Sequence, residues 1–220
     1  MIRQDYIMRM IEQLLRVLAE ATALKKANKY SEALLALDQA LQELTGFDAK
    51  FLNSLPDESL ILMLKTGDVL DADKCIIIAD LLQAEGDIYE AQSQIEESYY
   101  RYLKALNLFL AAFLSHIQTN LPHHFTQIEP LVEKLAAYEL PGKTKYNLWQ
   151  YYEQSGRYAQ AEDMLYELIE AEADAPEMVA QGISFYQRLL SKSNQELVTG
   201  NLPRAEIEEA LAELKALKQN

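Results

Sequence analysis

The sequence predicts an all-α protein built from antiparallel helical hairpins, and three observations support this. Half of the 220 residues are hydrophobic, so the chain can bury a substantial core. Only 7 glycines and 6 prolines are present, which argues against the turn-rich sequence of an all-β protein. Apolar residues recur three and four positions apart along most of the chain, which is the spacing of one face of an α-helix.

The first helix is predicted from Ile2 to about Asn28, because asparagine tolerates the left-handed conformation that often ends a helix. Gly, Pro and Asp residues mark where the later helices begin and end. The expected ranges are 31–43, 57–66, 71 or 73 to 85, 88–118, 125–139, 144–155, 158–172, 176–198 and 204–218, about ten helices in all. Every connection is short and the composition does not shift, so we expect a single domain over residues 1–220.

One short pattern occurs three times, within residues 28–41, 86–99 and 156–168. It consists of Gly or Asn, then Tyr or Ile two residues later, then Ala three residues further on. A tight helical hairpin needs a turn residue with unusual dihedral angles, an apolar side chain that fixes the turn, and a small residue where the two backbones cross. We therefore expect a turn at the start of each pattern and close helix crossings at Ala33, Ala91 and Ala161.

The second and third occurrences begin at residues 86 and 156, an interval of about twice the roughly 34-residue period of tetratricopeptide repeats. On these residues the chain resembles the tetratricopeptide repeat family. The small or apolar residues that fit the family pattern are Ala21, Ala33, Ala40, Ala79, Ala91, Ser98, Gly200, Leu202, Ala205 and Ala212. Trp149 and Leu168 beside Ala161, and Glu209, depart from it. The resemblance implies hairpins stacked into a right-handed superhelical array, here with irregular repeats.

The start of the chain carries a second resemblance. The opening MIRQDYIMRMIEQL and the hairpin LKKANKYSEAL are similar to the start of an uncharacterised bacterial protein family without an assigned activity. This likeness supports the helical fold and implies nothing about function.

The net charge of −14 limits the partners that the protein can bind. Binding to a phosphate backbone depends on clustered Lys and Arg, and the largest cluster here, Lys25, Lys26 and Lys29, lies between two glutamates. We therefore expect neither nucleic acid nor a membrane as a partner, and a basic or neutral protein surface suits the acidic chain better.

The hydrophobic segments predict a cytoplasmic protein. The longest nearly continuous apolar stretch, residues 105–114, covers only about half of the length that crosses a bilayer. Charged or amide residues interrupt every apolar run in the first twenty residues, so no signal-peptide core is present.

No pattern of residues predicts catalysis, a cofactor or a metal site. The two closest glycines, Gly142 and Gly156, are too far apart for a phosphate-binding loop. His123 and His124 are adjacent and cannot share a metal as an i, i+4 pair does, so we expect histidines that cap helices in a surface turn. Cys75 lies among isoleucines and should be a small buried hydrophobe. We expect no enzyme and no cofactor.

Tyrosine is frequent, with 13 residues, and one dense patch lies in the helix expected at 144–155. The tetratricopeptide resemblance implies that one side of this helix lines the binding groove. Aromatic and amide side chains there suit peptide recognition, but ordinary helix packing or a dimer interface would also explain them, and these two alternatives together outweigh the groove. Only two residues match the family's carboxylate-binding clamp, since Leu18, Thr22, Ile76 and Asp80 occupy neighbouring groove positions. The candidate partner-binding residues are Lys143, Tyr146, Asn147, Gln150 and Glu153.

The leading hypothesis is therefore a scaffold that binds a protein or peptide partner through a concave face. The competing hypothesis is a structural protein that forms a homodimer through its N-terminal helix or through the helix around residues 98–118. A third hypothesis, from a different class, is a small-ligand binder or enzyme with an acidic, tyrosine-lined pocket.

Overall fold

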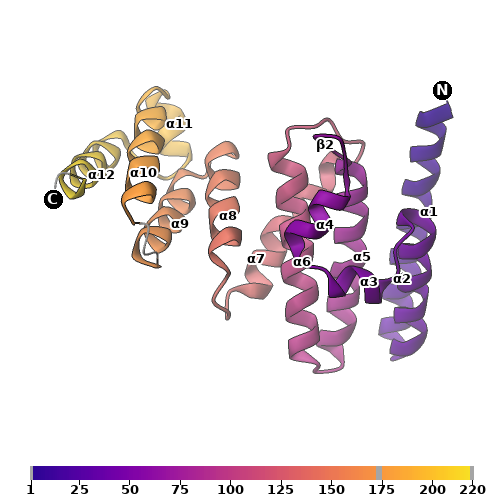
Figure 1. Ribbon diagram of the computed structural model, residues 1–220. Helices are drawn as coiled ribbons and strands as arrows, with labels where there is room; N and C mark the ends of the chain where they lie inside the picture. The colour runs from indigo at the N-terminus through magenta and orange to yellow at the C-terminus, as the bar shows by residue number, and fades with distance from the viewer. Residues whose placement is uncertain (1, 172–174, 219–220) are drawn as a thin grey trace. The chain divides into compact units, whose positions relative to one another are not determined.

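The computed structural model describes residues 2–171 and 175–218. Over these residues the chain forms twelve α-helices, one 3-10 helix and one two-stranded antiparallel hairpin, so the predicted all-α class is confirmed (Figure 1). The chain divides into two compact units, Met1–Glu139 and Leu140–Asn220. The single domain expected over residues 1–220 stays a prediction.

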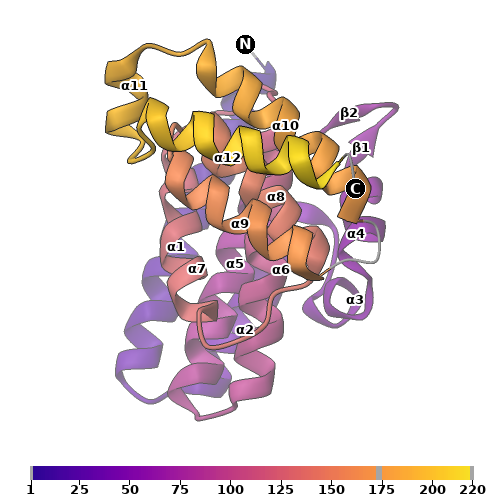
Figure 2. The same ribbon diagram turned by 90° about the vertical axis from the view of Figure 1, so that its left-hand side faces the viewer.

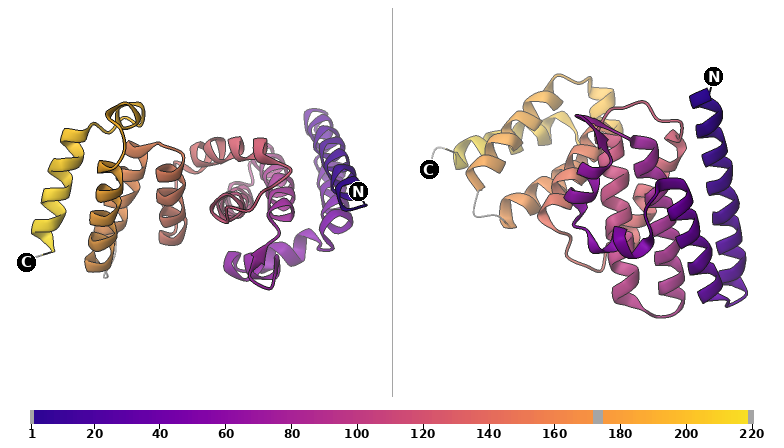
Figure 3. Two further views of the ribbon diagram at one scale, coloured as in Figure 1. Left: turned by 90° about the horizontal axis from the view of Figure 1, so that it is seen from above. Right: turned by 45° about the vertical axis from the view of Figure 1, so that its right-hand side comes forward.

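The first unit is built around the hairpin of its two central helices, α5 and α6. The α1–α2 hairpin packs on α5, while α4 and α7 pack on α6 (Figure 3). The elements of this unit are α1 Ile2–Lys26, α2 Tyr30–Thr45, α3 Ala49–Ser54, α4 Asp57–Met63, β1 Lys65–Thr66, β2 Val69–Leu70, α5 Ala72–Ala91, α6 Ile95–Leu114, η1 Pro122–Gln127 and α7 Ile128–Leu135.

The core of the first unit lies along α5 and α6, which are buried over most of their circumference. Cys75 on α5 is fully buried, as predicted, and burial raises the pKa of its thiol to about 12. The apolar stretch 105–114 supplies core residues from α6, and 105–110 are all buried. In the described residues no helix is both long enough and apolar enough to cross a membrane.

The second unit is a set of antiparallel helices. α8 packs on α9, α9 packs on α10, and α10 packs on α12 (Figure 2). The elements are α8 Gly142–Gln154, α9 Tyr158–Ala171, α10 Ala175–Leu190, α11 Asn194–Thr199 and α12 Arg204–Leu217. The prediction of one helix over 176–198 was wrong, because Ser193 and Glu196 form a capping box that begins the short helix α11.

The repeated sequence pattern marks two hairpins rather than three. Ala33 and Ala161 are fully buried at helix crossings, as predicted. Ala91 is exposed, and the turn expected at Gly86 is wrong because Gly86 lies inside α5. The chain turns instead at 92–94, where Ser93 has a φ of 60°.

Gly86 has a different role from the one predicted. A Cβ atom on Gly86 would lie 2.5 Å from a ring carbon of Tyr102, so the absence of a side chain lets the α6 tyrosine pack against the α5 backbone. The small residue at the α5–α6 crossing is therefore the glycine itself. In α12, the small residues expected at Ala205 and Ala212 are also exposed rather than packed.

Candidate functional site

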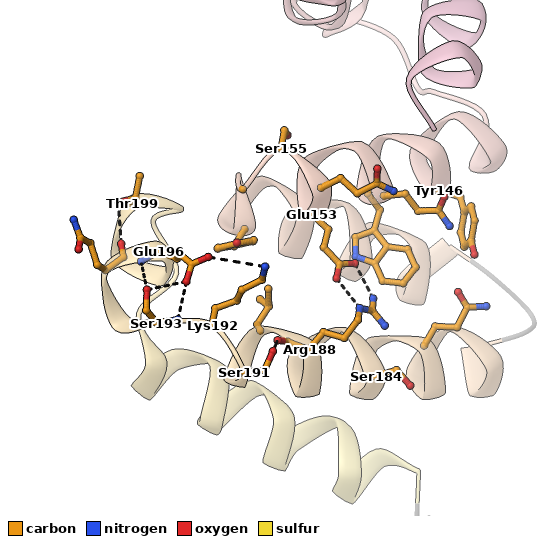
Figure 4. A pocket seen from close by; sticks show the side chains of 18 of the residues that line it. Tyr146, Glu153, Ser155, Ser184, Arg188, Ser191, Lys192, Ser193, Glu196 and Thr199 are labelled. Carbon is orange, nitrogen blue, oxygen red and sulfur yellow. Dashed lines mark hydrogen bonds and ion pairs between the residues drawn. The ribbon is translucent and has the colours of Figure 1, made fainter. Parts of the chain in front are cut away.

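A groove of about 1320 Å³ lies within the second unit, between α8, α10 and α11 (Figure 4). Its volume exceeds the roughly 300–1,000 Å³ that is usual for small-molecule pockets. Most of its lining residues carry polar side chains. The lining residues are Tyr146, Trp149, Gln150, Glu153, Gln154, Ser155, Gly156, Tyr158, Glu177, Ala180, Gln181, Ser184, Arg188, Leu189, Ser191, Lys192, Ser193, Gln195, Glu196 and Thr199.

Helical spacing places the two long walls of the groove. Tyr146, Gln150 and Glu153 lie three or four residues apart on α8, and so they share one face of that helix. α10 supplies the opposite wall with the same spacing, chiefly through Ser184 and Arg188. Pro141 directly precedes the first residue of α8, and Gly156, with a φ of 76°, allows the sharp turn after the helix, so this wall has a defined length.

An ion pair joins the two walls. Arg188 donates from Nε and Nη2 to the two carboxylate oxygens of Glu153, and both distances are 2.7 Å. This two-point geometry is the strongest that a guanidinium makes with a carboxylate. The hydrogen bond to Glu153 raises the pKa of Arg188. Figure 4 shows the two side chains meeting between α8 and α10.

The loop before α11 forms one end of the groove. The backbone N–H of Ser193 and its hydroxyl both donate to Glu196, at 2.9 and 2.8 Å. These bonds lower the pKa of Glu196. Because the capping box fixes the first turn of α11, this end wall is preorganised rather than shaped by a ligand.

Trp149 lies in the groove lining and is only 3% exposed. Its ring packs edge-on against Tyr146 and Phe185, with centroid distances of 5.6 and 5.9 Å. The indole nitrogen Nε1 is buried and has no hydrogen-bond partner within the described part of the chain. A buried donor without an acceptor destabilises a fold by about 1–3 kcal/mol.

The structure brings together three of the five predicted partner-binding residues. Tyr146, Gln150 and Glu153 line the groove. Lys143 and Asn147 lie outside the lining; the Lys143 ammonium is 5.3 Å from the centroid of the Tyr146 ring. Whether these residues bind a partner stays a prediction.

The α10 wall was not predicted from the sequence. Its residues have the same three- and four-residue spacing as those of α8, so the periodicity carried a usable signal. Trp149 was noted only as a departure from the repeat pattern, although a single tryptophan beside polar residues at helical spacing could have indicated a groove floor.

A second cavity, of about 1180 Å³, lies in the first unit between α2, α3, α5 and α6. At its base, Arg101 pairs with the buried Glu85 at 3.1 Å and with Glu97 at 2.8 Å. Burial raises the pKa of Glu85 to about 7, even though Arg101 opposes the shift. Its main charged groups are paired with one another, so they serve the helix packing.

One histidine differs from the expectation of a capping role in a surface turn. Nδ1 of His124 lies 2.6 Å from the carboxylate of the buried Asp80, and this contact connects η1 to α5. Burial raises the pKa of Asp80, and the hydrogen bond to Asp80 raises the pKa of His124. In residues 2–171 and 175–218, no group of three His, Cys, Asp or Glu side chains is placed to hold a metal.

The sequence matches a family of unknown function, DUF6483, over residues 1–219. The chain belongs to this family. The expected likeness to a family without assigned activity is thus confirmed, and the DUF6483 match extends well beyond the start of the chain. No curated protein and no solved structure matches this DUF6483 member. The tetratricopeptide resemblance stays a prediction.

Proposed function

We propose that this DUF6483 member is a non-enzymatic binding protein that holds an extended segment of another protein in the groove between α8 and α10. The observation that carries the proposal is the chemistry of the lining. It contains four glutamines and five serine or threonine residues, but only two aliphatic side chains, Ala180 and Leu189.

Glutamine amides both donate and accept hydrogen bonds, as peptide groups do, and serine hydroxyls can do either. A segment in extended conformation exposes its own N–H and C=O groups and can pair with such a lining along its length. An amphipathic helix would instead need a continuous apolar groove, and this lining mixes its two aliphatic residues and three aromatic rings with polar side chains.

The aromatic residues favour a peptide over a carbohydrate or a flat small molecule. Stacking needs an open ring face, and Trp149 and Tyr158 are both buried. The Tyr146 ring has the Lys143 ammonium over it and the edge of Trp149 against it. The rings therefore act as the floor that supports the polar walls.

The arrangement of the second unit supports a tetratricopeptide-like reading of the fold. α8 begins at Gly142 and α10 at Ala175, an interval close to the roughly 34-residue repeat of that family. The two walls are thus the first helices of successive hairpins, which are the helices that line the concave face in a right-handed array of this kind. α11 then interrupts the second hairpin and makes the repeats irregular.

Charge favours a basic or neutral partner. The chain has a net charge of −14, and the groove lining holds three glutamates against one arginine and one lysine. A basic segment would be attracted to this unit over several ångströms, and its binding should weaken as salt is added. We place the protein and this partner in the cytoplasm as part of the same proposal.

Selection of peptides from a random phage-displayed library against the full-length chain tests this function. Ser184→Tyr fills the groove from an exposed position on α10, and Gln187→Tyr adds the same side chain at an exposed position of α10 outside the lining. Selected peptides should bind the wild type and Gln187→Tyr alike. Ser184→Tyr should weaken binding at least about tenfold, which is ~1.4 kcal/mol. Gln150→Ala, on the facing wall, should weaken it as well.

Two results would reject this function. One is a library that yields no peptide with saturable binding. The other is a set of peptides that bind Ser184→Tyr as tightly as Gln187→Tyr. Because both positions are exposed, circular dichroism should show the same helix content for both variants, which excludes misfolding as the cause of any difference.

Self-association is a second proposal, favoured by one surface of the first unit. Met8 and Leu15 lie one above the other on α1 and are 52% and 53% exposed. The helix around residues 98–118 offers less, since its apolar stretch 105–110 is buried within the unit. Light scattering across a dilution series tests a dimer formed through α1, and a mass that stays that of a monomer at every concentration would reject it.

A further inference from the structure

Trp149 is the only tryptophan in the chain, and its indole N–H is an exception to a general rule of folded proteins. More than 90% of buried backbone groups, and most buried side-chain polar atoms, have a hydrogen-bond partner. The indole N–H is buried in the floor of an open groove and has no partner among the described residues. A missing acceptor at a groove floor points to a ligand that supplies one.

The neighbours of the indole explain why the protein itself does not supply an acceptor. The rings of Tyr146 and Phe185 pack against it edge-on. Glu153 is one turn further along α8, but both of its oxygens accept hydrogen bonds from Arg188. Arg188 thus holds the nearest side-chain carboxylate along the helix, and that carboxylate does not accept from Nε1.

Two contacts between α8 and α10 lie one helical turn apart. Trp149 meets Phe185, and the next turn of each helix carries Glu153 and Arg188. The Arg188 side chain is 53% exposed, whereas Trp149 is buried. The Glu153 side chain is 19% exposed, so the ion pair lies nearer to the solvent than the indole does.

We propose that a main-chain carbonyl oxygen of the bound segment accepts a hydrogen bond from Nε1 of Trp149, and that the segment reaches it by separating Glu153 from Arg188. This inference rests on the proposed function and deepens it, because it names the group that the groove recognises. The groove lining holds Glu153, Glu177 and Glu196 and thus repels a carboxylate, so a neutral carbonyl is the favoured acceptor.

The exchange favours the bound state when the segment replaces the contact that it separates. The two-point ion pair of Arg188 with the largely buried Glu153 is given up, so side chains of the segment must pair with these two groups. In return, a donor that was unpaired in the free protein gains an acceptor. Because this donor pairs with any peptide group, the contact contributes affinity without selecting a particular residue of the partner.

The single tryptophan provides a direct assay, since the ¹⁵N-labelled full chain has one indole N–H resonance in its NMR spectrum. The probe is N-methylacetamide, which carries one peptide group, and sodium acetate at equal concentration is the matched anionic probe. N-methylacetamide should move the indole proton downfield in a saturable way, and acetate should not. The shift should be larger in Glu153→Ala, which removes both the groove-spanning ion pair and the carboxylate that competes for the indole N–H.

A peptide selected for groove-dependent binding gives the second measurement. Trp149→Phe keeps an aromatic ring at the groove floor but removes the N–H donor. Binding of this peptide should therefore weaken about tenfold, as expected for the loss of one typical buried hydrogen bond. The wild-type indole resonance should move downfield when the same peptide is added.

The outcomes separate this inference from the function on which it rests. If groove-dependent peptides bind Trp149→Phe as tightly as the wild type and leave the indole resonance unmoved, the inference is wrong and the groove function stands. If no groove-dependent peptide exists and N-methylacetamide leaves the indole resonance in place, both are wrong. The wild-type spectrum answers the question even if Trp149→Phe does not fold.

Discussion

Gly86→Ala tests how α5 and α6 pack, because two physical effects of known size oppose each other at this position. Gly86 lies within α5, where alanine is favoured over glycine by about 1 kcal/mol of helix propensity. A Cβ atom at this position would lie 2.5 and 2.7 Å from two ring carbons of Tyr102, far inside the ~3.5–4.0 Å of an optimal carbon contact. Overpacking of this kind costs about 1–3 kcal/mol.

The Tyr102 ring cannot turn away easily. The Tyr102 hydroxyl donates to Asp87 at 2.8 Å and lies 3.1 Å from a carboxylate oxygen of Glu90. The Lys134 ammonium donates to the Tyr102 hydroxyl oxygen at 3.0 Å. The steric effect should therefore exceed the propensity gain, and Gly86→Ala should lower the free energy of unfolding by about 0–2 kcal/mol, which is the difference between the two effects.

A double-mutant cycle measured by urea denaturation and circular dichroism separates the two effects. When Tyr102→Ala removes the ring, the same Gly86→Ala change should become stabilising by about 1 kcal/mol, because only the propensity term remains. Tyr102→Phe is the matched control, since it keeps the ring and removes the anchoring hydroxyl, and the effect of Gly86→Ala there should be intermediate. A gain of about 1 kcal/mol in the wild-type background would refute the packing argument.

Three further predictions concern buried titratable groups of the first unit. The fold raises the pKa of Glu85 from 4.5 to about 7, so the folded state holds the proton more tightly, and the free energy of unfolding should fall as the pH rises through this interval. Glu85→Gln should remove that part of the pH dependence in urea denaturation at a series of pH values, and an unchanged profile would contradict the assignment. His124→Ala should destabilise the fold by about 1–3 kcal/mol, because it leaves the buried Asp80 without its partner. Since the contact with Asp80 raises the pKa of His124, the stabilisation from protonated His124 is lost as the pH rises through that raised pKa, and the loss from the substitution should shrink in alkaline buffer. Cys75 is fully buried with its thiol pKa raised to about 12, so a thiol reagent should label it only in denaturant, and rapid labelling of the native protein would contradict this.

The sequence predicted best those helices whose start and stop residues agree with the spacing of their apolar residues. Pro141 and Gly156 bracket α8, and the observed ends lie within two residues of the expected ones. Gly86 shows why the same reasoning failed elsewhere. A glycine can end a helix, or it can make room for a ring on the neighbouring helix. The sequence alone does not distinguish these two roles, and at Gly86 only the position of Tyr102 does.

Short elements were missed because they depend on contacts distant in the chain. α3 begins at a backbone N–H that donates to Asp38 on α2, a contact that periodicity does not encode. The β1–β2 hairpin contains two residues in each strand, too few for an alternating pattern to be visible.

Only one wall of the candidate site could be predicted from the sequence, for a similar reason. The α8 wall follows from helical spacing together with the resemblance to a repeat family. The facing wall requires knowledge of which helix lies opposite, and the Glu153–Arg188 ion pair that joins the walls connects residues far apart in the chain. The unpaired indole N–H of Trp149 is a property of three-dimensional packing alone.

The most direct test of the central claim is a map of backbone amide chemical shifts in the full-length chain as a library-selected peptide is added. The account predicts that the perturbed amides fall on the facing sides of α8 and α10 and in residues 191–199, with Gln150, Glu153 and Ser184 among them. Perturbations confined to the first unit, or to the sides of α9 and α12 that do not line the groove, would contradict it.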